Sequence, residues 1–274
     1  ECYEQGLLSD VDLDGIKLEW GSSQAVIELL KKMIHREGIG ASLADGSLAA
    51  AKNLGRKSQN FAMQAGGLEL AFHDPRYDPG LALHAVVEPE PGKHVRGAWQ
   101  FYEMFKLWKV IPSLPRPKLF YKKSEKYARP KIKAKIAAAN SCFTHFLDAC
   151  GVCLFGAFLG VHRMRVFEYV NAVTGWNGSP QEMMAIGGRI QTLKLLFNLR
   201  EGIQRNHAIN SRLLGVPPLK SGSARGRQVL LEKMIEAYWQ ESGWDEQTGL
   251  PVKKMLQDLG EVFPREKLFK GEMK

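Results

Sequence analysis

The stretch SPQEMMAIGGRIQTLKLLFNLREG, residues 179–202, contains the clearest helix signal in the chain. Ser179 can accept a hydrogen bond from the third helical amide, and Pro180 needs no amide partner at the first helical position. Glu182 can reach back to the amide of Ser179 and complete a capping box. The stretch therefore predicts a helix that continues to about Glu201.

Other segments combine helical spacing of apolar residues with a capping or stop residue. They run from Ser22 or Ser23 to about His35, from Leu43 to Leu54, over residues 230–243, and from Pro251 to about Gly260. Alternation typical of strands is scarce. We therefore expect an all-α, multihelical fold.

Length and composition are typical of a globular protein of more than one domain. The chain has 274 residues, of which 45% are hydrophobic and 24% charged. No stretch approaches the roughly 20 apolar residues that span a bilayer, and the start lacks the pattern of a secretory signal, so we expect no membrane segment and a cytoplasmic enzyme. The run Glu88-Pro89-Glu90-Pro91-Gly92 is a plausible joint. It divides the chain into helical domains over 1–90 and 91–274.

Positive charge is concentrated in one stretch. Residues 116–135 contain nine Lys or Arg and one acid, which gives +8 of the net +9. The stretch overlaps a proline-containing segment, 112–130, that is predicted to be a long surface excursion. Such a patch attracts nucleic acid or acidic proteins, and its aromatic residues could stack on bases. A solvated insertion without a partner explains the same pattern.

The four cysteines, Cys2, Cys142, Cys150 and Cys153, are too few for a disulfide framework and are predicted to be reduced. Cys150 and Cys153 form a C-x-x-C pair in an apolar context. A zinc site would need a second pair at matching spacing, and a thioredoxin-like pair would need a preceding strand. From the residues alone, buried structural cysteines are the main alternative to a functional role.

Two motifs and several shorter blocks give the chain a family resemblance. Asp148-Ala149-Cys150-Gly151-Val152-Cys153 is similar to the motif Asp-x-x-Gly-Leu-Cys, and Asp10-Val11-Asp12-Leu13-Asp14 to Asp-x-x-Gly-Leu-Asp, with Asp12 in the place of the glycine. Further similar blocks follow in the same order at 66–69, 73–76, 171–176, 197–202, 238–239 and 243–245. Together they resemble the two C-terminal helical domains of the tungsten-pterin aldehyde:ferredoxin oxidoreductases.

The resemblance implies a bis-pterin cofactor of tungsten or molybdenum and a [4Fe–4S] cluster. Paired aspartates can accept charge-assisted hydrogen bonds from a pterin. The implied cofactor-binding residues are Asp10, Leu13, Asp14, Asp148, Gly151, Val152 and Cys153, and Cys153 is also the implied metal ligand, as the fourth cluster thiolate. A non-glycine residue at Asp12 would resist a positive φ angle.

Part of the implied site is absent from these 274 residues. The family's other cluster cysteines form a C-x-x-C-x-x-x-C run upstream of the first motif, next to an N-terminal β domain, and neither is present. The resemblance also implies a histidine that transfers protons near the metal, and His94 in Gly92-Lys93-His94 is the candidate for this catalytic role.

The fold and activity that follow are expectations. Two helical domains would pack around a deep cofactor crevice, in an enzyme that oxidises aldehydes to carboxylic acids and passes electrons through the cluster to ferredoxin. Ferredoxins are acidic, so the basic stretch could attract them. A relative that reduces another carbonyl or an aromatic acyl substrate is an alternative within the family, and a nucleic-acid or acidic-partner binding module is one from another class. A homo-oligomer is possible.

Overall fold

The computed structural model describes residues 1–55, 57–117, 130–203 and 208–258, and most of them lie in helices. Within these ranges the regular strands are β1 (Gln64–Ala65) and β2 (Leu68–Glu69), of two residues each. The expected all-α class is therefore confirmed. Among the described helices none is long and apolar enough to cross a membrane.

The N-terminal part contains α1 (Ser23–His35), α2 (Ile39–Leu43), α3 (Ser47–Leu54) and η1 (Ser58–Phe61). The predicted first helix is confirmed: the Ser22 hydroxyl accepts from the Ala25 amide at 3.2 Å, and the helix ends at His35. Leu13, Ile16, Ala25 and Ile39 form a small buried core beneath these helices.

The helix predicted from Leu43 to Leu54 is wrong in its extent. The chain leaves the helical path after Leu43, and Gly46 adopts a φ of 92°, which residues with a side chain avoid. A new helix, α3, then begins at Ser47. Its first amide donates to Oε1 of Glu69 at 2.6 Å, so the cap comes from a residue 22 positions along the chain.

A short hairpin follows, in which β1 and β2 pair antiparallel through Gly66 and Gly67. A distant segment, η4 (Ser211–Leu214), packs beside it. Ala65 forms a bridge with Ile209, and Arg212 forms an ion pair with Glu1 at 2.9 Å. The segment around η4 is thereby tied to the N-terminal part.

The larger core surrounds α7 (Pro130–Ala149). α4 (Pro79–Val87), α5 (Trp99–Phe105), α10 (Pro180–Arg200) and α11 (Glu232–Glu241) all pack against it. The largest fully buried apolar side chains include Trp99, Tyr102, Phe105, Phe143, Phe146 and Tyr238. Shorter elements complete this part: η2 (His94–Arg96), η3 (Leu107–Lys109), α8 (Leu154–Ala157), α9 (Val166–Thr174) and α12 (Lys253–Asp258).

α10 confirms the capping box. The Ser179 hydroxyl accepts from the Glu182 amide at 3.3 Å, and Oε2 of Glu182 accepts from the Ser179 amide at 2.7 Å. The helix ends at Arg200, one residue before the predicted end. Gly187 lies where α10 crosses α7, and a side chain there would collide with the carbonyl of Cys142. This glycine therefore sets the close approach of the two helices.

The two C-terminal helices are confirmed with shifted starts, whereas the predicted end of the last one, near Gly260, lies outside the described residues. α11 begins at Glu232, so Leu230, which is 81% exposed, precedes the helix instead of contributing to its buried face. The helix ends before Gly243, as expected. α12 begins two residues after Pro251, because Pro251 forms a bridge with Trp244.

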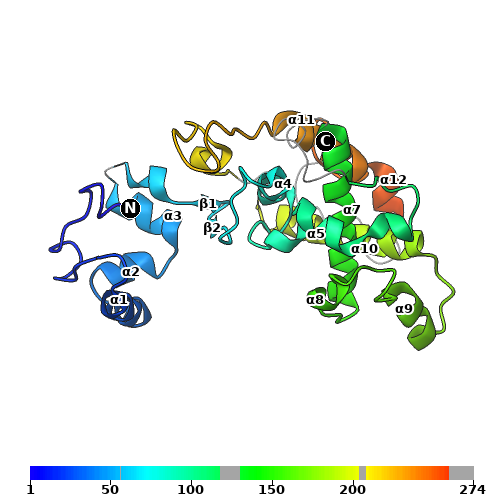
Figure 1. The fold of residues 1–274 in the computed structure, drawn as a ribbon, viewed down its shortest axis with the longest axis horizontal. Coiled ribbons are helices and arrows are strands. Elements are labelled where there is room, and N and C mark those ends of the chain that lie inside the picture. Colours follow the sequence, from blue (N-terminus) through cyan, green and yellow to red (C-terminus); the bar gives the residue numbers. More distant parts are fainter. Residues whose placement is uncertain (56, 118–129, 204–207, 259–274) are drawn as a thin grey trace.

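The molecule is elongated in Figure 1, with α1–α3 at one end, α7–α12 at the other, and the hairpin and α4 between them. The division at residue 90 stays a prediction. The segment predicted as a joint is held by contacts: Glu88 is buried, and the Pro89 carbonyl accepts from the Asn198 amide group at 2.9 Å.

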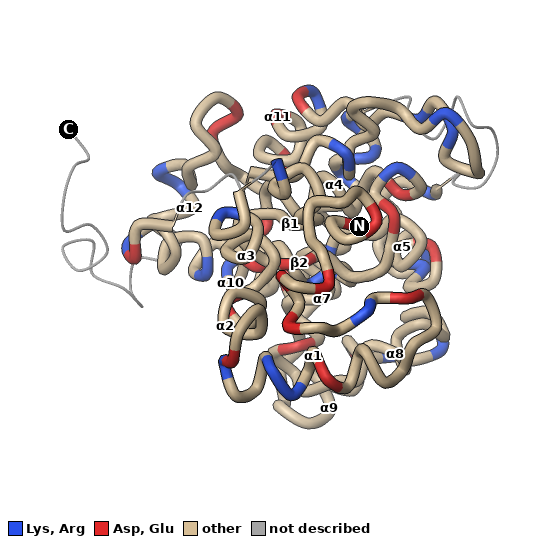
Figure 2. Tube along the Cα trace, turned by 90° about the vertical axis from the view of Figure 1, so that its left-hand side faces the viewer, with Lys and Arg blue, Asp and Glu red and all other residues tan. Residues whose placement is uncertain are grey.

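Most of the basic stretch lies outside the described residues, because 118–129 are among those not described. One of its described lysines does not face solvent. Lys133 is 7% exposed, and its ammonium lies 4.2 Å from the centroid of the Trp99 ring. In the part drawn in Figure 2, basic and acidic residues are interspersed. The predictions of an acidic partner or nucleic acid therefore stay predictions.

Candidate cofactor site

The second motif forms the end of α7 and the turn into α8. Gly151 has a φ of 66°, and its amide donates to the Asp148 carbonyl at 3.1 Å. The Val152 amide donates to the Leu147 carbonyl, also at 3.1 Å. These two bonds are the Schellman arrangement that closes a helix with glycine. Gly151 and Val152 therefore end α7, in addition to the cofactor contact that the resemblance implies for them.

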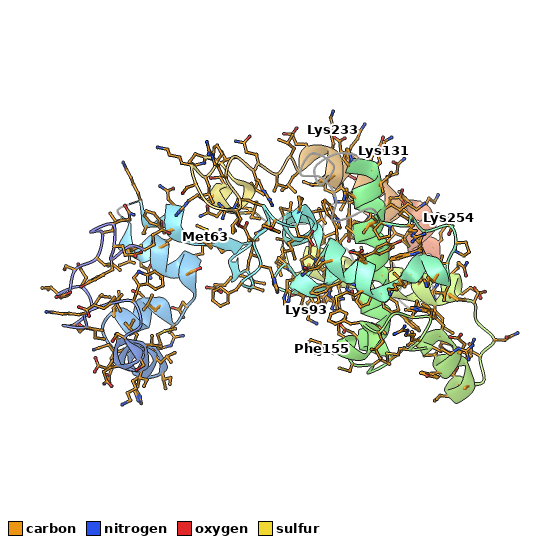
Figure 3. All side chains as sticks on the ribbon, in the orientation of Figure 1. Met63, Lys93, Lys131, Phe155, Lys233 and Lys254 are labelled. Carbon is orange, nitrogen blue, oxygen red and sulfur yellow. The ribbon has the colours of Figure 1, made fainter. Side chains whose placement is uncertain are left out.

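Cys153 follows this turn and is exposed, at the start of α8. The four cysteines are unpaired, as predicted. Because the Cys153 side chain reaches solvent, it is not an inert core thiol. Cys142 differs: burial raises its pKa to about 12. Cys153 is thus the thiol of this chain best placed to bind a group from outside, and Phe155, labelled in Figure 3, is 76% exposed on α8 beside it.

A cluster of charged side chains holds Asp148. Nη2 of Arg96 donates to Oδ2 of Asp148 at 2.8 Å and to Oε2 of Glu90 at 3.0 Å. Lys93, labelled in Figure 3, lies 3.7 Å from Asp148 and 3.5 Å from Glu90. Lys194 from α10 forms an ion pair with Glu90. Arg96 itself is completely buried, so its position is fixed while the carboxylate of Asp148 remains half exposed.

His94 begins η2, two residues before Arg96. Its ring centroid lies 4.7 Å from that of His73 and 6.1 Å from that of Phe101. Burial and the neighbouring His73 lower the pKa of His94. A neutral imidazole can accept a proton near neutral pH, as a general base must. The buried Arg96 anchors both the turn that carries His94 and the second motif.

The first motif is used largely within its own part of the chain. Oδ1 of Asp10 accepts from the Tyr3 hydroxyl at 2.5 Å, and the Leu13 side chain is buried. Oδ2 of Asp14 lies 3.1 Å from Nζ of Lys32 and accepts from the Ile39 amide at 3.4 Å. The hydrogen bonds from Lys32 and Ile39 lower the pKa of Asp14. Asp14 therefore joins α1 to α2.

The predicted conflict at Asp12 does not arise, because Asp12 is not among the described residues with positive φ. Its carboxylate accepts from the amide and hydroxyl of Ser9 at 2.8 Å and 2.7 Å. The left-handed position falls instead at Asp14, with a φ of 55°. The motifs also differ in spacing: Asp148 precedes Cys153 by five positions, and the residue five before Asp14 is Ser9.

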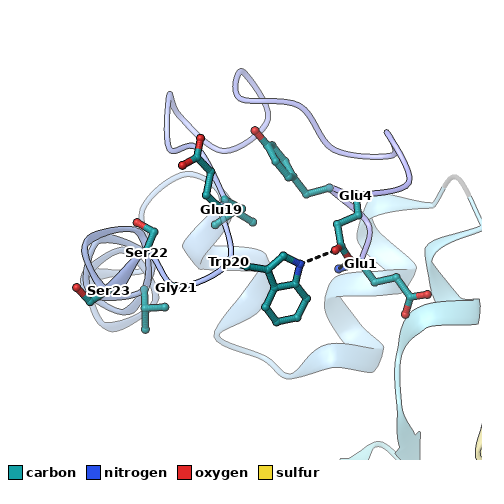
Figure 4. A pocket seen from close by; sticks show the side chains of 10 residues that line it. Glu1, Glu4, Glu19, Trp20, Gly21, Ser22 and Ser23 are labelled. Atoms are coloured by element: carbon teal, nitrogen blue, oxygen red, sulfur yellow. Dashed lines mark hydrogen bonds and ion pairs between the residues drawn. The ribbon is translucent and has the colours of Figure 1, made fainter. Parts of the chain in front are cut away.

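A cavity of about 420 Å³ lies beside the first motif. Figure 4 shows its lining, which includes Tyr3, Leu18, Trp20 and Val26. Trp20 is 91% exposed, and its indole nitrogen donates to Glu4 at 2.6 Å. None of the lining residues belongs to the first motif, and the link to it is Tyr3, whose hydroxyl donates to Asp10.

The structure does not bring the two motifs together. The segments that carry them lie at opposite ends of the molecule in Figure 1, with the hairpin and α4 between them. The expected common crevice is therefore not formed by the described residues. The physical reason is that each motif is anchored to its own core, Asp14 to α1 and α2, and Asp148 to Arg96.

Within the described residues, no three His, Cys, Asp or Glu side chains are grouped as metal ligands would be. Among the described residues, Cys153 is the exposed thiol that could serve as a cluster donor. That donor fits the role of a single cluster ligand. Asp148 fits the binding of a pterin amine or amide, because it is half exposed and fixed in position.

Sequence reasoning missed the residues that hold Asp148. Glu90 and Arg96 are six positions apart, but Asp148 lies 52 positions after Arg96, and Lys194, which holds Glu90, lies on α10. None of these residues belongs to a recognisable motif. The alternation of acids and prolines at 88–91 indicates a joint and carries no signal for these contacts.

Comparison with known proteins supports the family that the two motifs resemble. The profile of the family "Aldehyde ferredoxin oxidoreductase, domains 2 & 3" matches residues 1–260. The chain belongs to this family. The resemblance drawn from the motifs is confirmed, and the chain is part of an oxidoreductase family.

Curated relatives cover almost the whole chain. The tungsten-containing aldehyde ferredoxin oxidoreductases of Pyrococcus furiosus and Thermococcus kodakarensis are each 29% identical over 95% of the chain. The "aliphatic sulfonate oxidoreductase, WOR-like subunit" of Pyrococcus furiosus is 26% identical. The chain spans about 40% of the length of these relatives.

A solved structure has the same fold. It is titled "Active site complex BamBC of Benzoyl Coenzyme A reductase in complex with 1,5 Dienoyl-CoA" and matches 99% of this chain and 44% of its own. The TM-score is 0.66 and the sequence identity 20%. At this identity the likeness concerns the fold.

Proposed function

We propose that this chain is the helical part of a tungsten- or molybdenum-dependent oxidoreductase that converts aldehydes to carboxylic acids. Membership of the family supports the reaction class, and the names of the tungsten-containing relatives support the metal and the substrate class. The observation that carries the proposal for this chain is the turn after α7. There a fixed, half-exposed Asp148 and an exposed Cys153 lie on one short segment.

The reaction assigns distinct tasks to these residues. Oxidation of an aldehyde takes one oxygen atom from water and releases two electrons and two protons. The metal–pterin group supplies the two-electron chemistry when bound, and the cluster passes the electrons on singly. Asp148 accepts hydrogen bonds from the pterin edge, and Cys153 binds one iron of the cluster. His94 accepts a proton released from substrate or water, for which its lowered pKa is suited.

The test is Cys153→Ser in the full-length protein, purified without oxygen. We expect the variant to lose the cluster's characteristic electron paramagnetic resonance signal and to retain less than about four irons per chain, the content of an intact cluster. Tungsten and molybdenum content is measured by elemental analysis, and aldehyde oxidation with a dye acceptor.

The matched control is Cys150→Ser, three residues earlier in the same turn. Cys150 is half-buried and packs against the larger core, so this variant should keep its cluster. A cluster signal unchanged in Cys153→Ser would contradict the assignment of Cys153. A full-length protein that contains neither tungsten nor molybdenum, or that contains one of them and oxidises no aldehyde, would contradict the proposed reaction.

A second candidate is reduction of another carbonyl, an aromatic acyl substrate above all. The observation behind it is the fold shared with a benzoyl-coenzyme A reductase in complex with 1,5 Dienoyl-CoA. The aliphatic sulfonate relative widens the possible substrates further. A reduced low-potential dye offered together with benzoyl thioesters distinguishes the candidates: dye oxidation that depends on thioester and not on aldehyde would favour reduction.

The remaining roles are also proposals. Ferredoxin, named in the relatives' titles, is the proposed acceptor, and an acidic carrier suits a chain with a net charge of +9. The proposed location is the cytoplasm. A homo-oligomer and completion of the site by a preceding β domain belong to the same proposal.

A further inference from the structure

A small cavity lies behind His94. It has space for about one water molecule, about 10 Å³ measured as the space open to the centre of a water. Its walls include three histidines, His73, His84 and His94, together with short apolar side chains and Gly92. The three histidines come from different segments: a loop after the hairpin, the middle of α4, and η2.

His84 is the innermost of the three. It is 2% exposed, and neither of its ring nitrogens has a hydrogen-bond partner among the described residues. The Glu90 backbone is near enough to influence the ring, yet it does not meet hydrogen-bonding geometry. Buried polar groups without partners are uncommon, and an ordered water is the usual explanation. The cavity that His84 lines can hold one.

The charge state of His84 is also fixed. Burial, followed by the positive charge of Arg96, lowers its pKa to about 3. His84 therefore stays neutral at every pH near neutrality, and a neutral imidazole always offers one lone pair. It cannot take a proton away from the site, but it can accept a hydrogen bond.

We propose that His84 is the positioning partner of His94. One water in the cavity accepts a hydrogen bond from the protonated His94 ring and donates one to the lone pair of His84. The bridge stabilises the protonated form of His94. The proton does not move on to His84, because burial and the positive charge of Arg96 disfavour protonation of His84. This inference rests on the proposed role of His94 in proton transfer, although the bridge itself is a property of the protein without cofactor.

The other groups that face His94 do not replace this contact. The exposed His73 ring lies 4.7 Å from the His94 ring at an interplanar angle of 32°, and a positive charge there disfavours a second one on His94. Phe101 covers the ring from α5 and offers no lone pair. Lys93 precedes His94 and forms ion pairs with Glu90 and Asp148.

The test measures the pKa of His94 directly in the full-length protein freed of metal. Diethyl pyrocarbonate modifies neutral imidazoles, so its rate of reaction at His94, followed against pH by peptide mass spectrometry, reports that pKa. We expect His84→Leu to lower the pKa of His94 by about one unit, because a hydrogen bond to the charged form is lost. His84→Gln, whose amide oxygen can accept from the water, should restore the wild-type value.

The matched control is His145→Leu. His145 is also buried and neutral beside Arg96, but it does not line the cavity, so the pKa of His94 should not change. An unchanged pKa in His84→Leu, or an equal fall in His84→Gln, would overturn the proposal. A crystal structure of the wild-type protein supplies a second measurement that needs no variant: density for a water between the rings supports the bridge, and a dry cavity rules it out.

Because the readout is a pKa in metal-free protein, it is separate from the test of the reaction. A bridge without aldehyde oxidation would leave His84 as the partner of His94 and refute the proposed function. Aldehyde oxidation without the water bridge would support the proposed function and refute the role of His84.

Discussion

Arg96 is the residue on which the second motif depends. Its guanidinium is completely buried and binds Asp148 and Glu90 through one nitrogen, Nη2. Two carboxylates thus share one buried cation. Burial, and after it the positive charge of this cation, lowers the pKa of His84 and His145 and keeps them neutral. The position of a surface carboxylate is therefore determined from inside the protein.

We expect Arg96→Met to lower the free energy of unfolding by about 3 kcal/mol, near the lower end for breaking a buried ion pair, because the carboxylates left behind are partly hydrated. The variant should also bind less tungsten or molybdenum, since Asp148 loses its fixed position. Thermal unfolding and elemental analysis of the full-length protein measure the two effects.

The control for Arg96→Met is Lys93→Met, because Lys93 lies near the same two carboxylates. Its side chain is half exposed, and exposed ion pairs contribute about 0–1 kcal/mol. Equal losses of stability in the two variants would show that burial of Arg96 does not matter.

Glu88 gives the protein a pH dependence of an uncommon sign. It is buried between α4, α10 and α11, where Gln191 donates to it at 3.0 Å and Tyr238 donates a short hydrogen bond. Burial raises its pKa, and the hydrogen bonds only oppose this in part. The folded state therefore binds the Glu88 proton more tightly than the unfolded state, and stability from this group falls as pH rises above its ordinary pKa.

We expect Glu88→Gln to remove this fall in stability with rising pH. The free energy of unfolding of the variant, relative to wild type, should increase as pH rises from the ordinary pKa of a glutamate toward the raised pKa of Glu88. Thermal unfolding from about pH 4, near the ordinary glutamate pKa of about 4.3, up to about pH 8 measures it.

Glu90→Gln is the matched control with the opposite sign. Burial opposes ionisation of Glu90, but Lys194, Arg96 and Lys93 outweigh it and lower the pKa. Stability from Glu90 is present above its ordinary pKa and is lost as pH falls, so this variant should be less stable than wild type near neutral pH and converge with it in acid. The same pH trend in both variants would contradict the assignment.

At the scale of elements, the crossing of α7 and α10 depends on one glycine. A side chain at Gly187 would collide with the backbone of Cys142. We expect Gly187→Ala to lower the free energy of unfolding by about 1–3 kcal/mol, the usual cost of overpacking, even though alanine favours the helix. Gly188→Ala is the neighbouring control, because its methyl group would meet only the Cys142 sulfur at 3.5 Å. Gly188→Ala should be neutral or slightly stabilising. A larger loss of stability in Gly188→Ala than in Gly187→Ala would refute the role of Gly187 in this crossing.

The elements that could be predicted are those whose signals are local. The capping box of α10 and the Ser22 cap of α1 each join residues three positions apart, so both can be predicted from the sequence. The break at Gly46 was missed because the cap of α3 comes from Glu69, which the fold brings to Ser47. For the same reason the site was only half visible: Asp148 and Cys153 carry a motif, whereas Arg96 and His84 acquire their roles through burial.

At the scale of the whole molecule, the two motifs are fixed to separate cores at opposite ends of the described chain. Large apolar side chains are exposed in both parts, Trp20 in the N-terminal part and Phe155 on α8, at 91% and 76%. Single exposed apolar residues need no explanation. The two separate cores, and not these side chains, are therefore what keeps the motifs apart among the described residues.

The charge of the molecule leads to the last prediction, which concerns its electron acceptor. Attraction between a basic surface and an acidic protein raises the association rate, and salt screens it within about 10 Å at 0.1 M ionic strength. We expect the full-length variant with Lys118, Lys122, Lys123 and Lys126 changed to Gln to reduce an acidic ferredoxin at least about tenfold more slowly at low salt. Its rate with a small cationic dye should not fall.

The control replaces Lys31, Lys52, Lys233 and Lys253 with Gln; these lysines are exposed and lie on other elements. If both quadruple variants slow ferredoxin equally, net charge alone matters; if neither does, the basic stretch has no part in electron transfer.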